Sequence, residues 1–155
     1  MNTKVLKQIT FLSIVLGAML GLITAIPFIG SIAFWILMCI ASTIIITMMT
    51  KSELLIINSV RESAVLGAII GFTSFLGFSL FYVPIIIILA KYFNIYPNYG
   101  ISMALSNASL GVIIIFVIFV AILSATLNAF SGFLTFYGIN FFKSNNNEHT
   151  SFKLK

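Results

Sequence analysis

Residues 13–21 read SIVLGAMLG, and residues 63–71 read SAVLGAIIG, so the two stretches agree at six of nine positions. Each is a GxxxG motif: Gly17 and Gly21 lie four residues apart, as do Gly67 and Gly71, and such a pair shares one helix face. In lipid there is little hydrophobic force between helices, and missing side chains allow the close backbone contact that drives association. The two stretches therefore predict the packing faces of two membrane helices.

The composition places the chain in a membrane. Of its 155 residues, 61% are hydrophobic and 7% are charged, and the mean hydropathy is +1.19. A soluble domain of this length cannot enclose so much apolar surface in one core. Asp, Glu, Lys, Arg and His are missing from residues 11–50, 63–90 and 92–142, and long uncharged apolar stretches are the main signal of transmembrane helices.

These stretches predict an all-α, polytopic membrane protein with four transmembrane helices in one domain, residues 1–143. The expected spans cover about residues 11–26, 32–49, 63–90 and 110–142, and residues 144–155 have the composition of a disordered cytoplasmic tail. As unbroken helices the third and fourth would be roughly 42 and 50 Å long, against about 30 Å of hydrocarbon core. The third must therefore tilt, kink or break.

Proline and glycine mark the expected helix breaks. Pro27 ends the first span because proline has no N–H for the helical ladder, and the short link after it makes the first two spans an antiparallel hairpin. Gly77 and Pro84 are the points at which we expect the third span to kink or break.

The connection between the second and third spans, KSELLIINSVRE at residues 51–62, is charged at both ends and apolar in the middle. We expect it to lie along the cytoplasmic surface of the membrane. Ser59 and Glu62 have the spacing of a capping box, which predicts the start of the third helix.

The basic residues predict the orientation. In the four-span arrangement only Lys91 lies on one side, and seven lie on the other: Lys4, Lys7, Lys51, Arg61, Lys143, Lys153 and Lys155. The positive-inside rule then puts both termini in the cytoplasm, and we expect the bacterial cytoplasmic (inner) membrane. Trp35 lies near the outer end of the second span and is a predicted interface anchor. Since the basic residues are scattered and not gathered on one face, the net charge of +5 does not indicate nucleic-acid binding.

The repeated stretch suggests an internal duplication. Both copies begin spans that run from inside to outside, so the two helical hairpins would be parallel repeats related by an axis along the membrane normal. Coincidence between two stretches of limited composition is the alternative. The simplest arrangement packs the first span against the third through facing glycine strips, and a homodimer contact through one strip is a second possibility.

Few residues could carry catalysis. Hydrolases and transferases need a nucleophile and base, or paired carboxylates, at one site. The acidic and histidine side chains are Glu53, Glu62, Glu148 and His149, none of which lies in a span. No phosphate-loop, dinucleotide or zinc-protease motif occurs. We therefore expect no enzymatic activity, no cofactor and no metal site.

Asn128 is the most unusual residue of the spans, because a buried amide needs partners. It is predicted to be a polar latch between helices, with dimerisation or the lining of a polar cavity as alternatives. Gly132, in the small-residue stretch SATLNAFSGF, is a further expected packing position. Hydroxyl side chains of membrane helices usually bond their own backbone or a neighbouring helix. Those in the spans include Thr24, Ser42, Thr43, Thr47, Thr73, Ser74, Ser79, Ser124, Thr126 and Ser131.

Several features come one after another along the chain: GAMLG, then Ile-Pro at residues 26–27, a second apolar span, Glu62 ahead of GAIIG, and NAFSGF followed by FFK at residues 141–143. This order resembles a group of uncharacterised small bacterial four-span membrane proteins with glycine-rich helices. Ser131 departs from the pattern, where the group implies a glycine beside Gly132. The resemblance implies an architecture and no known activity.

The sequence thus favours a non-catalytic integral membrane subunit or scaffold that associates with itself or with another membrane protein. A channel or permease for an uncharged small solute is the alternative, because pores can be lined by carbonyls and hydroxyls without charge. A pore-forming lytic protein is a second alternative. The expected partners are the lipid bilayer and other membrane helices.

Overall fold

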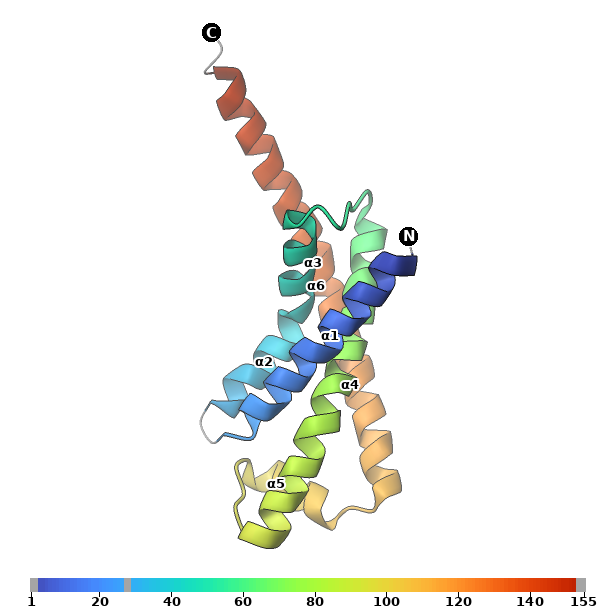
Figure 1. The fold of residues 1–155 in the computed structure, drawn as a ribbon, viewed down its shortest axis with the longest axis vertical. Helices are drawn as coiled ribbons and strands as arrows, with labels where there is room; N and C mark the ends of the chain where they lie inside the picture. The colour runs from blue at the N-terminus through green and yellow to red at the C-terminus, as the bar shows by residue number, and fades with distance from the viewer. Residues whose placement is uncertain (1–2, 27–28, 153–155) are drawn as a thin grey trace.

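The computed structural model describes residues 3–26 and 29–152, with side chains as far as residue 141, and its regular elements are all helices (Figure 1). They are α1 (Thr3–Thr24), α2 (Gly30–Cys39), α3 (Ala41–Lys51), α4 (Val60–Phe93), α5 (Tyr99–Asn107) and α6 (Leu110–Phe152). By length and composition α1, α4 and Leu110–Phe141 of α6 can cross a membrane, and α2 with α3 makes a fourth candidate span. The predicted all-α fold with membrane-spanning helices is confirmed, with three such helices, or four when the bent pair is one span.

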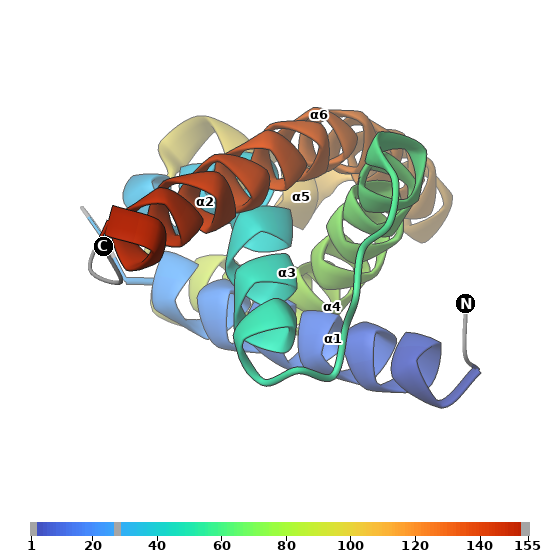
Figure 2. The same ribbon diagram turned by 90° about the horizontal axis from the view of Figure 1, so that it is seen from above.

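α4 is the central helix of the bundle. Seen from above, α1 and α6 lie on opposite sides, with α3 and α4 between them (Figure 2). α1 and α4 run in the same direction, whereas α6 and the α2–α3 pair run back (Figure 1). We call the end where α1 and α4 begin the basic end, because it carries Lys4, Lys7, Lys51 and Arg61. α5 lies at the opposite end.

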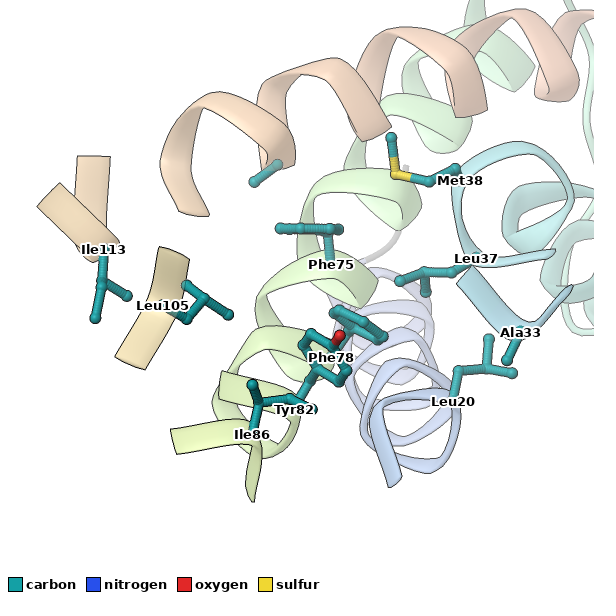
Figure 3. Close-up of a cluster of buried hydrophobic side chains, with 11 residues drawn as sticks. Leu20, Ala33, Leu37, Met38, Phe75, Phe78, Tyr82, Ile86, Leu105 and Ile113 are labelled. Atoms are coloured by element: carbon teal, nitrogen blue, oxygen red, sulfur yellow. The ribbon is translucent and has the colours of Figure 1, made fainter. Parts of the chain in front are cut away.

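Apolar side chains fill the bundle in two clusters. Near the basic end, the buried residues are Ile9, Ala41, Ile45, Ile46, Met49, Leu55, Leu66 and Ile70. In the other half, rings from α4 lie between α2 on one side and Leu105 of α5 on the other (Figure 3). The outer surface is also apolar, since Ile115 and Phe119 of α6 are 70% and 67% exposed. A bilayer is the solvent that such a surface requires.

The second predicted span is not one helix. α2 ends at Cys39, α3 begins at Ala41, and the two helices are bent by 63° at Ile40. The predicted span over residues 32–49 is therefore a bent pair of helices. No proline or glycine lies at the bend, so its cause is a tertiary contact, which is made by Asn128 of α6.

The third predicted span is one helix of 34 residues that passes through Gly77 and Pro84. The expected breaks at these two residues are therefore wrong. α4 is packed by α1 on one side and by α6 on the other, and neighbouring helices make proline tolerable inside a membrane helix. Gly77 instead allows close packing, because a Cβ atom there would lie 2.5 Å from the carbonyl oxygen of Ile14 in α1.

Local hydrogen bonds fix both ends of α4. At its start the N–H of Glu62 donates to the Ser59 hydroxyl at 3.2 Å, which confirms the predicted cap. The Glu62 carboxylate accepts from the N–H of Asn58, also at 3.2 Å. At its end Asn94 adopts the left-handed conformation (φ 53°), which asparagine tolerates and which stops the helix.

The outer helices begin and end differently from the prediction. α1 starts at Thr3, eight residues before the expected span, and so carries Lys4 and Lys7 in its first turns. α6 stays helical to Phe152, where we expected a disordered tail from residue 144. Residues 143–152 contain neither glycine nor proline, so nothing in their composition stops the helix.

Two connections lie at the end of the bundle opposite the basic end: one joins α1 to α2, and the other joins α4 to α6. Pro27 lies outside the described residues, and the chain reverses between the end of α1 at Thr24 and the start of α2 at Gly30. The connection between the third and fourth predicted spans contains α5, a short helix that we did not expect from the sequence. Ser102 and Leu105 of α5 are buried against the bundle, so packing stabilises a helix of nine residues that is too short to form alone.

Candidate functional site

Asn128 of α6 lies fully buried at the bend between α2 and α3. Its side-chain nitrogen Nδ2 is 3.1 Å from the carbonyl oxygen of Leu37 and 2.9 Å from that of Met38. The backbone N–H of Ser42 donates to its Oδ1 at 2.8 Å. One amide group therefore bonds the last turn of α2 and the first turn of α3.

These backbone groups are the ones that the bend separates. In an unbroken helix, the N–H of Ser42 would bond the carbonyl of Met38, and the next carbonyl back, that of Leu37, would also have a helical partner. The bend removes these contacts, and unsatisfied backbone groups in a membrane interior are costly. Asn128 supplies the missing donor and acceptor together, which explains how a span without proline or glycine can bend here.

Further hydrogen bonds hold Asn128 in place. The Ser42 hydroxyl donates to the backbone carbonyl of Asn128 at 2.9 Å. One turn earlier on α6, the carbonyl oxygen of Ser124 is 3.1 Å from Nδ2. The Ser124 hydroxyl in turn donates to the carbonyl of Gly71 in α4 at 3.0 Å. The amide is thus oriented by α6 itself, bonded directly to α2 and α3, and linked to α4 through Ser124.

The polar contacts continue along α6 toward the basic end. The Ser63 hydroxyl of α4 donates to the carbonyl of Gly132 at 2.7 Å. On the side of α3, the Thr43 hydroxyl lies 2.8 Å from that of Ser131 and 2.9 Å from that of Thr135. We call this set the polar seam: Ser42, Thr43, Ser63, Gly71, Ser124, Asn128, Ser131, Gly132 and Thr135.

Three glycines allow α4 and α6 to come this close. A Cβ atom on Gly71 would lie 2.5 Å from the carbonyl oxygen of Ser124, and one on Gly132 would lie 2.6 Å from that of Ser63. At Gly67 the nearest atom would be the backbone oxygen of Asn128. No side chain fits at these positions without separating the helices, because the nearest atoms are backbone atoms or, at Gly71, also the Cβ of Asn128, which cannot rotate away.

The glycine strip of α1 packs against α4, but not against the glycine strip of α4. A Cβ atom on Gly17 would collide with the backbone of Ser74, and one on Gly21 would lie 2.7 Å from the carbonyl oxygen of Phe78. The expected arrangement, in which the strips of the first and third spans face each other, is therefore wrong. Since Gly67 and Gly71 face α6, α4 uses two different faces for its two neighbours.

The remaining predicted site residue is Trp35, which lies on α2 with 62% of its side chain exposed. Ser63 and Thr135 complete the polar seam, and neither was predicted from the sequence. Their spacing could have identified them: Ser63 lies one turn before Gly67 and Thr135 one turn after Ser131, so each shares a helix face with a predicted contact residue. Within the described part of the chain, no three His, Cys, Asp or Glu side chains lie close enough to hold a metal ion.

The chain matches no protein-family model, no curated protein and no solved structure. The resemblance noted from the sequence thus extends only to a small helical protein with three or four candidate membrane spans.

Proposed function

We propose that this polytopic membrane protein is a non-catalytic subunit or scaffold that works through helix–helix contact. The observation that carries the proposal is the hydrogen bonding of Asn128: its amide is fully buried, and both its nitrogen and its oxygen bond backbone groups of α2 and α3. The seam hydroxyls of Ser63 and Ser124 likewise bond the backbone of a neighbouring helix. Hydrogen bonds of this kind hold membrane helices together.

A partner would bind the outward face of α6. The glycine strips of α1 and α4 are occupied within the chain, so they are not free for a second molecule. α6 instead presents large apolar side chains, among them Ile115, Phe119 and Phe130, which are 62–70% exposed. The partner is a second copy of this chain or another membrane protein.

The charge distribution supports an orientation. Lys4, Lys7, Lys51 and Arg61 gather at the basic end, and Lys91 lies at the other. By the positive-inside rule the basic end faces the cytoplasm, with both termini on that side, in a bacterial cytoplasmic membrane.

Photocrosslinking in the native membrane tests the subunit proposal. A photoreactive amino acid at Phe119 should yield one crosslinked protein of defined mass, because that side chain points away from the bundle. The matched control is Ala121 on the same helix, which is fully buried and should give no crosslink to another chain. Crosslinks to lipid alone from Phe119, Ile115 and Phe130 would contradict the proposal.

A permease for an uncharged small solute is the second candidate, favoured by the bent pair α2–α3. Interrupted helices form the solute sites of many transporters, where freed backbone groups bind the solute. Here Asn128 already bonds such groups, which is why this function ranks second. Proteoliposomes should show glycerol and urea permeation no faster than protein-free liposomes if the subunit proposal holds. Faster permeation would favour the permease, and release of entrapped calcein would favour the lytic alternative.

A further inference from the structure

A cavity of about 250 Å³ lies in the half of the bundle away from the basic end. Its walls come from α1, α2, α4, α5, α6 and the connection before α5. The lining residues include no Asp, Glu, Lys, Arg or His. Burial of a charged group without a partner is strongly unfavourable, so any ligand of this cavity is neutral.

Aromatic rings dominate the walls. Phe75, Phe78 and Tyr82 succeed one another on α4 (Figure 3), and the last two rings stack with centroids 4.9 Å apart. Phe34 of α2 meets Phe78 edge to face at 6.0 Å. Ring faces and edges bind a further planar ring in offset or edge-to-face contact. The cavity is smaller than a typical drug-sized site, so a ligand of one or two rings fits it.

Polar groups also line the cavity. Among them are the phenol of Tyr82, which is 5% exposed, and the side-chain amide of Asn98. The hydroxyls of Thr24 and Ser79 also line the cavity, but they donate their protons to their own helices at 2.7 and 2.9 Å. The lining groups that can donate a hydrogen bond to a bound acceptor are therefore Tyr82 and Asn98, together with the hydroxyl of Ser31 and the indole N–H of Trp35.

The mouth of the cavity faces the bilayer. Trp35, Ile101 and Phe116 line it and are 62%, 45% and 51% exposed. These side chains are large and apolar, as lipid-facing residues are, and so a ligand reaches the cavity from the membrane.

From these observations we propose that the cavity binds a neutral, membrane-soluble planar ring compound with a ring carbonyl, the chemistry of a quinone headgroup. The ring packs against the aromatic walls, and the carbonyl accepts a hydrogen bond from Tyr82 or Asn98. A lipid acyl chain is the other conceivable occupant, but it offers no acceptor to these groups and no flat face to the rings.

The single tryptophan makes the proposal measurable. Trp35 is the one tryptophan of the chain and lines the cavity, and quinones quench indole fluorescence. The protein in lipid nanodiscs is titrated with menadione, a two-ring quinone, with correction for absorption. We expect saturable quenching of Trp35. Tyr82→Phe, which removes only a hydroxyl, should weaken binding about twofold to tenfold, the effect of one hydrogen bond.

Two Val→Phe variants serve as a matched pair. Val120 of α6 lines the cavity, so Val120→Phe should abolish saturation. Val65 of α4 is 50% exposed and lies outside the cavity lining, so Val65→Phe should leave binding unchanged. Quenching that rises linearly with menadione and is the same in all four proteins reports collision in the bilayer and overturns the proposal. Displacement of menadione by 2-methylnaphthalene or methyl palmitate at equal concentration would overturn its assignment to a ring carbonyl.

Discussion

Replacement of Asn128 by leucine should destabilise the bundle and straighten the α2–α3 bend. Both side chains have four heavy atoms with the same branching, so the change removes hydrogen bonding while it keeps the shape of the side chain. The carbonyls of Leu37 and Met38 and the N–H of Ser42 each lose the partner they have in α6. With the amide gone, the Ser42 N–H can return to the Met38 carbonyl as in a regular helix.

The size of the effect is set by three interhelical hydrogen bonds. Such bonds between membrane helices contribute about 0.6 kcal/mol on average and up to about 1.7 kcal/mol. Three of them give a loss of about 2–5 kcal/mol in the free energy of unfolding. If α2 and α3 straighten, some helical hydrogen bonds return and the loss of unfolding free energy is smaller. Straightening would also increase the distance between the two ends of the α2–α3 pair. The unfolding free energy and that distance therefore have to be measured together.

The assay combines SDS-induced unfolding in mixed micelles with a spin-label distance between Ile32 of α2 and Met48 of α3, both exposed. The matched control is Asn107→Leu, since that exposed amide bonds only the carbonyl of Met103 in its own helix, at 2.9 Å. It should cost less than about 1 kcal/mol. An Asn128→Leu protein that unfolds within about 0.5 kcal/mol of the parent, with an unchanged distance, would refute this account of the bend.

Three further predictions concern packing, capping and orientation. Gly67→Ala should lower the free energy of unfolding by about 1–3 kcal/mol, because its Cβ meets the backbone of α6, whereas Gly138→Ala, with nothing within 4 Å, should be neutral or stabilising in the same SDS titration. Ser59→Ala should cost about 1 kcal/mol through loss of the α4 cap, and amide exchange should increase in the first turn of α4 only; exchange spread over the whole helix would contradict a local role. In a cysteine-free background, cysteines placed at Ser52 and Asn98 should react with an impermeant maleimide from opposite sides of the membrane, and labelling of both from one side would reverse our topology.

Much of the fold could be predicted from composition and pattern. The uncharged stretches marked every long helix, because a membrane interior admits only helices whose backbone is bonded internally. The spacing of Ser59 and Glu62 marked the start of α4, because a cap depends on neighbours in sequence. The breaks expected at Gly77 and Pro84 failed for the converse reason: packing by α1 and α6 outweighs the local tendency of these residues to interrupt a helix.

The sequence by itself determined that the chain is a helical membrane protein and that the buried amide of Asn128 needs hydrogen-bond partners. Only the tertiary structure decided which partners those are. The bend at Ile40 depends on an amide more than 80 residues away, and Gly67 and Gly71 face α6 and not α1 because α4 lies between its two neighbours. Periodicity assigns a residue to a face of its own helix, but which helix covers that face is set by the packing of the whole bundle.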